Sequence, residues 1–132
     1  MAQGRGSAGR VAMVVSVAMV WLVVLVLVQA IEPVDGAVYT VGDSSGWSFG
    51  SGSWTKGKRF KAGDMLVFNY DSTIHNVVAV NRGGYNGCTT PAGAKFYKSG
   101  KDRLKLSKGV NFFICSIPGH CDSGMKISIN AV

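Results

Sequence analysis

Three side chains near the C-terminus have the types and the spacing to hold a metal ion. Cys115, His120 and Met125 follow one another at steps of five residues. A thiolate, an imidazole and a thioether on one loop, completed by a second imidazole, form the ligand set of a type I copper site. The chain contains only two histidines, so His75 is the only candidate for the second imidazole. We therefore predict one copper ion held by these four residues.

Each of these residues has a simpler explanation when it is taken alone. A single histidine is usually a surface or core residue, and a methionine that opens a strand usually packs in the core. Cys115 could be a buried, inert thiol. The order and spacing of the whole set, in a chain with two histidines, favour a metal site over these separate explanations.

Zinc is the alternative metal, but methionine is a poor zinc ligand and structural zinc sites usually take four cysteines or histidines. Nucleophilic catalysis by a Cys–His pair is the alternative chemistry. It needs a group that orients the base, and Asp122 beside Cys121 does not supply one convincingly. Four ligands that include a methionine leave copper no open position for a substrate, so we expect an electron carrier and not an enzyme.

The chain has three cysteines, Cys88, Cys115 and Cys121, and an odd number predicts one disulfide and one thiol with another role. Three pairings are possible. Cys115 is the best candidate for the spare thiol, because it ends an apolar run and leads the His and Met spacing. A free thiol in an oxidising compartment should be buried or metal-bound. On this interpretation Cys88 pairs with Cys121 across a long loop.

Short runs rich in β-forming residues, separated by glycine-rich turns, predict an all-β domain built as an antiparallel β-sandwich. Cys115 should end one strand, His120 should lie in a turn made by Pro118 and Gly119, and Met125 should start the last strand. His75 should open an earlier strand. The segment 89–97 predicts a short helix or an irregular crossover. The expected strands are 38–41, 65–70, 75–80, 103–106, 110–115 and 126–130.

The first 36 residues have the layout of a secretory signal peptide. Arg5 and Arg10 give a basic start, and the segment 11–28 is apolar except for Ser16. Cleavage is expected after Ala30 or after Gly36, with Gly36 favoured because the first strand opens directly after it. The run is long for a signal core, so an uncleaved anchor is the alternative. We predict a signal peptide over 1–36, a single domain over 37–132, and secretion.

The predicted mature part carries 12 basic and 5 acidic residues, so its net charge is +7. This charge predicts a redox partner with an acidic surface, or anionic cell-wall material; secretion disfavours nucleic acid. The simpler explanation of this charge is that it keeps the protein soluble. We expect a monomer, with no stable membrane span if the signal is cleaved. A second hypothesis is an extracellular binding or signalling protein that acts through Lys56, Lys58 and Lys61.

Several motifs together resemble the phytocyanins, extracellular blue-copper proteins of plants. The resemblance covers about residues 37–132 and depends on Gly46-Trp47, on His75-Asn76-Val77-Val78, on Phe113-Ile114-Cys115 and on Gly119-His120-Cys121 with Gly124-Met125. Further matching segments are Val41-Gly42-Asp43, Lys58–Asp64, Phe68-Asn69-Tyr70, Cys88–Pro91 and Ser99–Asp102.

The resemblance implies a cupredoxin-like Greek-key sandwich or barrel of two sheets, with one or two short helices. It implies that His75, Cys115, His120 and Met125 bind copper and that Cys88 and Cys121 form the family disulfide. It also implies that Asn76 steadies the thiolate through hydrogen bonding. Relatives of the stellacyanin type carry glutamine in place of Met125, and the nodulin-like ones often lack ligands. The resemblance associates such proteins with cell walls, reproduction and development.

Overall fold

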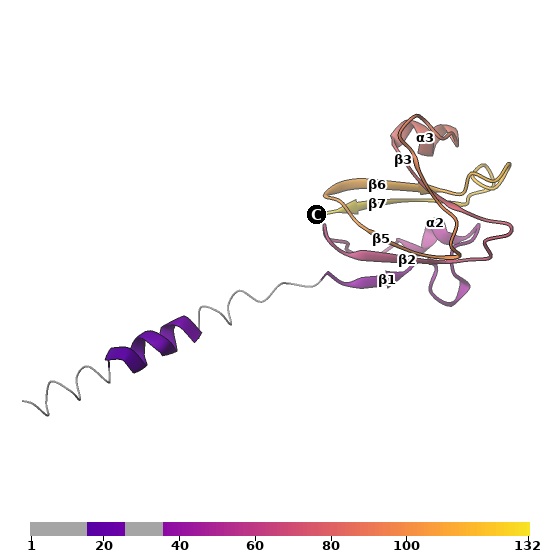
Figure 1. Ribbon diagram of the computed structural model, residues 1–132. Helices are drawn as coiled ribbons and strands as arrows, with labels where there is room; N and C mark the ends of the chain where they lie inside the picture. The colour runs from indigo at the N-terminus through magenta and orange to yellow at the C-terminus, as the bar shows by residue number, and fades with distance from the viewer. Residues whose placement is uncertain (1–15, 26–35) are drawn as a thin grey trace, which may run out of the picture. The chain divides into compact units, whose positions relative to one another are not determined.

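The computed structural model describes residues 16–25 and 36–132 (Figure 1). Residues 16–25 are helical, and among the described residues no helix is long and apolar enough to cross a membrane. Contacts divide the chain into Met1–Val34 and Asp35–Val132. The possible cleavage site after Ala30 lies outside the described residues, and the boundary after Gly36 stays a prediction.

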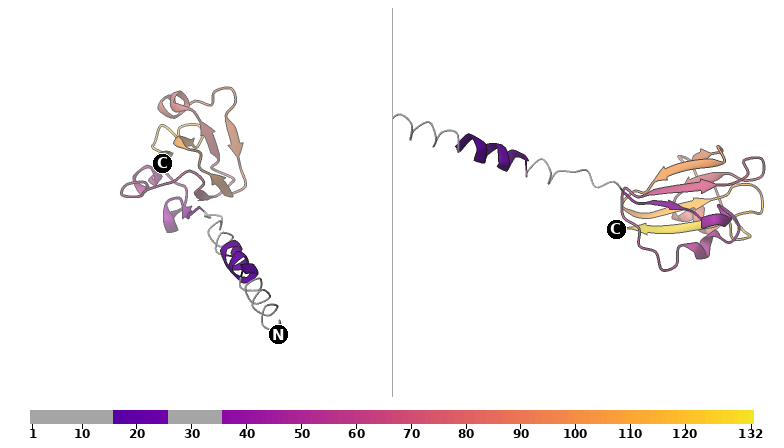
Figure 2. Two further views of the ribbon diagram at one scale, coloured as in Figure 1. Left: turned by 90° about the vertical axis from the view of Figure 1, so that its left-hand side faces the viewer. Right: turned by 90° about the horizontal axis from the view of Figure 1, so that it is seen from below.

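The second unit is a sandwich of two sheets, which Figures 1 and 2 show as two layers. One sheet has the strand order β1-β2-β5 and the other has the order β4-β3-β6-β7. This confirms the predicted all-β class with two sheets. The strands are β1 (Val38–Thr40), β2 (Met65–Asn69), β3 (Val77–Val80), β4 (Lys95–Tyr97), β5 (Lys101–Lys105), β6 (Gly109–Ile114) and β7 (Lys126–Ala131).

Alternation of apolar and polar residues decides which face of each strand is buried. In β5 and β7 every second side chain is buried and the others face solvent. Strand β2 lies in the middle of its sheet, and its three central side chains are all buried. The two inner faces meet through Phe68, whose ring lies 5.2 Å from that of Trp47 and 5.3 Å from that of Phe113. Burial of such aromatic side chains supplies much of the stability of a small core.

One side of the sandwich is closed and the opposite side is open. On the closed side, Phe60 bridges to Ala131, and the Val132 N–H donates to the Phe60 carbonyl at 3.0 Å. On the other side, β4 and β5 are the edge strands of their sheets and do not pair with each other. The predicted metal ligands lie at the end of the sandwich where β3 and β7 begin and β6 ends.

Strand β1 pairs with β2 in parallel, so the expectation of a purely antiparallel sandwich is wrong at this pair. A parallel pair needs a long crossover, and residues 41–64 provide it. That segment contains two short helices, η1 (Asp43–Ser45) and α2 (Ser51–Trp54), between the first two expected strands.

The segment from the end of β3 to β5 also differs from the expectation. The sequence predicts a helix or an irregular crossover over 89–97, but the last three residues of this segment form strand β4, which pairs antiparallel with β3. A short helix, α3 (Arg82–Gly87), lies earlier, between the expected strand over 75–80 and the segment 89–97. Glycine gives α3 a poor intrinsic helix propensity, but the Asn81 side chain caps it by accepting from the Gly84 N–H at 2.8 Å. Tyr85 packs on Phe112 with the ring centroids 5.3 Å apart.

Candidate metal centre

His75 is held by a turn directly before β3. The Asp71 side chain accepts hydrogen bonds from the Thr73 N–H at 2.9 Å and from the Thr73 hydroxyl at 2.6 Å. The Asp71 carbonyl accepts from the His75 N–H at 3.0 Å. An aspartate that bonds to the backbone two residues on stabilises a turn without help from the rest of the fold. These hydrogen bonds also lower the pKa of Asp71, since they favour its ionised form.

The other three predicted ligands lie on the loop between β6 and β7, and backbone hydrogen bonds connect them. The Cys115 N–H donates to the Met125 carbonyl at 3.0 Å, and the Met125 N–H donates to the His120 carbonyl at 3.0 Å. Gly119 precedes His120 with φ 81°, a conformation that L-residues with side chains rarely adopt. The loop therefore has one tight conformation that is fixed by its own backbone.

Three donor atoms converge at this end of the sandwich. His75 Nδ1 lies 3.1 Å from His120 Nδ1, and Cys115 Sγ lies 3.9 Å from His75 Nδ1 and 3.6 Å from His120 Nδ1. A point in the plane of these atoms is about 2.1 Å from all three, which is a bond length for a first-row transition metal. The donor geometry therefore fits a metal ion.

The identity of the donors favours copper over zinc. Among residues 36–132, no fourth His, Cys, Asp or Glu joins the cluster of His75, Cys115 and His120, so a structural zinc site lacks a ligand. Met125 is fully buried and belongs to the same apolar cluster as Cys115. One thiolate, two imidazoles and a nearby thioether suit copper in both of its oxidation states.

The protonation of the site also suits a metal. Burial lowers the pKa of His75, and the neighbouring His120 lowers it further, against an opposing effect of Asp71. A lowered pKa keeps the imidazole neutral, as coordination requires. Cys115 is completely buried and is not part of a disulfide, so it is the spare thiol that the cysteine count predicts.

Asn76 joins the two segments that carry the donor atoms. Its side-chain amide donates to the Ser116 hydroxyl at 2.8 Å, and its side-chain oxygen accepts from the Ser116 N–H at 2.8 Å. Its backbone carbonyl accepts from the Trp47 indole N–H at 2.9 Å. Asn76 is buried, and it follows His75 just as Ser116 follows Cys115. The pair of hydrogen bonds therefore fixes the distance between an imidazole and the thiolate.

The predicted disulfide is confirmed: Cys88 and Cys121 are bonded, with their Cα atoms 5.6 Å apart. The bond joins the residue after His120 to the C-terminal end of α3, 33 residues earlier in the chain. It therefore ties the loop between β6 and β7 to a second part of the fold.

Phe49 lies beside both histidines, and sequence reasoning missed it because it belongs to a glycine-rich loop without a ligand-type residue. Its ring packs edge-on to His120 at 5.0 Å and to His75 at 5.8 Å. A Cβ atom at Gly124 would lie 3.3 Å from the Phe49 carbonyl, so a glycine there allows a close approach of the two loops. Ser116 was also missed, because its role depends on Asn76, 40 residues away.

Comparison with known proteins agrees with this chemistry. Residues 47–125 match the family described as the plastocyanin-like domain. The basic blue protein of Arabidopsis thaliana is 56% identical over 132 residues, which is 100% of each chain.

Two solved structures share the fold. One is described as cucumber basic protein, a blue copper protein; it has 62% identity, a TM-score of 0.72, and coverage of 73% of this chain and 100% of that chain. Spinach plantacyanin has 55% identity, a TM-score of 0.65 and the same coverage.

Proposed function

The chain belongs to the phytocyanins, the plastocyanin-like blue copper proteins of plants, and we propose that it carries single electrons through a copper ion held by His75, Cys115, His120 and Met125. Copper is the cofactor, and the reported relatives bear the names of copper proteins and not of enzymes. The observation that carries the proposal is the convergence of two Nδ1 atoms and one Sγ atom at bonding distance from one point.

When it is bound, copper supplies a centre that alternates between Cu(II) and Cu(I). The protein's part is to keep the donors in one geometry for both states, so that little rearranges when an electron moves. The Asn76–Ser116 hydrogen bonds, the backbone bonds of the loop and the Cys88–Cys121 disulfide all serve this purpose. A buried Met125 and Cys115 exclude water from the thiolate side.

The His120 ring offers the route for the electron. Both histidines turn Nδ1 toward the site, so the opposite edge of each ring faces away from it. His120 is half-buried, and around it lie the half-buried Ile117 and the exposed Pro118 and Phe49. An apolar rim with few charges allows a partner to approach closely without a large desolvation cost.

Secretion belongs to the same proposal. The apolar segment 11–28 after a basic start supports export, and a disulfide persists in an oxidising compartment such as the plant cell wall space. The net charge of +7 supports a redox partner with an acidic surface.

The test is to load the secreted protein with Cu(II) and record its visible spectrum and voltammogram. We expect an intense thiolate-to-copper band and a reversible one-electron wave. A colourless protein in which Cys115 is verified as reduced would disprove the copper–thiolate site. A coloured protein without a reversible wave would keep the site and reject electron transfer.

A further inference from the structure

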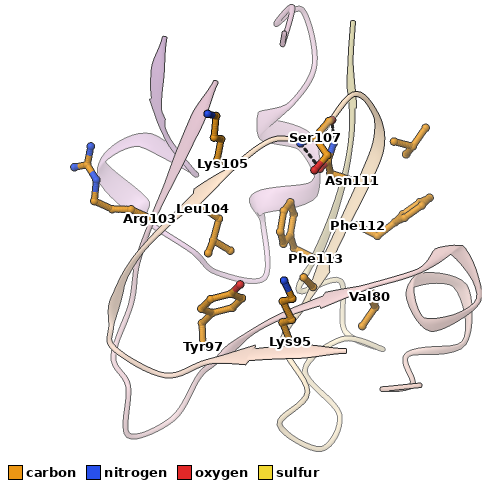
Figure 3. Close-up of a pocket in the computed structure, with 12 residues that line it drawn as sticks. Val80, Lys95, Tyr97, Arg103, Leu104, Lys105, Ser107, Asn111, Phe112 and Phe113 are labelled. Atoms are coloured by element: carbon orange, nitrogen blue, oxygen red, sulfur yellow. Dashed lines mark hydrogen bonds between the residues drawn. The ribbon is translucent and has the colours of Figure 1, made fainter. Parts of the chain in front are cut away.

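The open side of the sandwich carries a groove that the metal site does not use. It lies between the edge strands β4 and β5, and its volume is about 510 Å³. Figure 3 shows Lys95, Tyr97, Leu104 and Phe113 turned into the same space from three different strands. Val110 and Phe113 of β6 line the groove, whereas Cys115, which directly follows that strand, does not.

The groove is positively charged. Its charged lining residues are Lys95, Arg103 and Lys105, and among the described residues no aspartate or glutamate lines it. All three side chains are exposed to solvent. Lys101 continues the series on β5, so cations occupy every second position of that strand. Their repeat is two residues, which is about 6.8 Å in an antiparallel sheet.

Among residues 36–132, no strand pairs with the outer edge of β5, which borders the groove. The Leu106 N–H donates to the Asp64 carbonyl, and the Gly100 carbonyl accepts from the Tyr70 N–H. The backbone N–H and C=O groups of the even-numbered residues of β5 therefore point toward β2. Bonding direction alternates along an antiparallel strand. The N–H and C=O groups of Arg103 and Lys105 therefore point away from β2, into the groove that these residues line.

A strand added at this edge would meet two different environments in alternation. Side chains opposite Arg103 and Lys105 would lie on the outer face, next to those cations. The side chains between them would point inward, as Leu104 does, toward Tyr97 and Phe113. The edge therefore matches a segment in which acidic and apolar residues alternate.

We propose that the β4–β5 groove binds an extended peptide segment of a partner protein, with alternating acidic and apolar residues, as an added strand on β5. The free backbone groups would supply main-chain hydrogen bonds and the cations would select the charge. A uronic-acid polysaccharide carries the charge but has no peptide backbone to continue the ladder. A second copy of this chain at the same edge would place lysine and arginine against lysine and arginine, which is unfavourable.

The probe is an acetylated, amidated hexapeptide of alternating Glu and Val, titrated into the copper-loaded protein by calorimetry and by amide NMR. We expect the amide resonances of Arg103 and Lys105 to shift. Arg103→Glu should weaken binding by about fivefold or more, since it removes an exposed ion pair worth up to ~1 kcal/mol and adds a repulsion between like charges. The matched control is Lys56→Glu, an exposed residue outside the groove with the same charge change, which should alter binding less than twofold.

A second peptide separates strand pairing from charge attraction. N-methylation of its glutamates removes the N–H groups that would pair with β5 and leaves the charge unchanged, so we expect at least a tenfold loss of affinity. Equal affinity of the methylated peptide would overturn the proposal, because charge alone would then explain binding. Binding of a hexameric uronic-acid oligosaccharide at equal affinity, equal weakening by Lys56→Glu, or no peptide binding would each overturn it as well. None of these outcomes depends on electron transfer.

Discussion

The polar groups at the metal end of the domain are buried and hydrogen-bonded, whereas those of the β4–β5 groove are exposed to solvent. At the metal end, Cys115 is fully buried and Asn76 has hydrogen bonds from its side chain and its backbone. In the groove, Arg103 and Lys105 are exposed, and their backbone groups face away from the sheet. A small ion with a fixed coordination geometry requires donors that are already in place, whereas an added strand requires groups that are still free to pair. If the two regions are independent, a change in one of them should leave the other unaffected.

The largest effect should come from Cys115→Ser. A serine hydroxyl does not replace a thiolate as a copper ligand, so the thiolate-to-copper band should vanish completely. Affinity for the groove peptide should change by less than about twofold, because Cys115 is buried and does not line the groove. The visible spectrum and the peptide titration measure both effects on one sample. Loss of both properties in a variant with native far-UV circular dichroism would show that the regions are coupled.

Removing the disulfide should have the next largest effect. The bond closes a loop with a sequence separation of 33, and its loss in a Cys88→Ala/Cys121→Ala variant should lower the free energy of unfolding by about 3–4 kcal/mol. Urea denaturation of the metal-free protein measures this value without a contribution from bound copper. A loss below about 1 kcal/mol would mean that the loop between β6 and β7 is held by its own backbone bonds alone.

Two asparagines allow a matched test of the contrast. Asn76→Ala should cost about 2–3 kcal/mol, because it leaves the Ser116 N–H without its partner in a buried site. It should also weaken copper binding by about tenfold. Asn111 makes similar side-chain bonds with Ser107 at the rim of the groove, but these bonds are exposed to water.

Asn111→Ala should therefore cost about 1 kcal/mol or less and leave the copper spectrum unchanged. Chemical denaturation and a copper competition titration compare the two variants. If both variants lost the same stability, burial would not be what distinguishes the two regions.

The sequence predicted the metal end far better than the groove, for physical reasons. Ligand chemistry is a property of residue type, so a loop with cysteine, histidine and methionine and a chain with two histidines were enough to select the residues that converge. The disulfide followed from the odd number of cysteines together with the choice of Cys115 as the spare thiol. The groove depends on topology: β4 was missed because three residues are too few to show alternation, and without β4 the open side could not be located. The Asn76–Ser116 bonds also needed the fold, since they join segments 40 residues apart.

Tyr70 marks the boundary between the two regions, and its expected effect is the smallest. Its hydroxyl contacts the Asp102 carboxylate and lies 3.1 Å from the Tyr97 carbonyl, so it connects β5 and β4. It also directly precedes Asp71, which forms the turn that holds His75. Burial, with the Asp102 hydrogen bond as the next cause, raises the pKa of Tyr70 from 10.0 to about 12. A raised pKa in the folded state means that ionisation is easier in the unfolded chain, so this contribution to stability is complete below pH 10.0 and is lost between pH 10.0 and about 12.

Tyr70→Phe removes the titrating group together with its hydrogen bond. We expect a loss of about 1 kcal/mol at neutral pH and a shallower decline of stability above pH 10.0 than in the unaltered protein. Denaturation at several alkaline pH values measures the slope, and the difference in phenolate absorbance between the unaltered protein and the variant isolates the titration of Tyr70 from that of the other three tyrosines. Because the variant leaves the Asn76–Ser116 bonds in place, its copper spectrum should stay unchanged while the groove peptide binds more weakly, since β4 is no longer held against β5. A changed copper spectrum with unchanged peptide binding would contradict this expectation. Tyr70 would then support the metal site and not the groove.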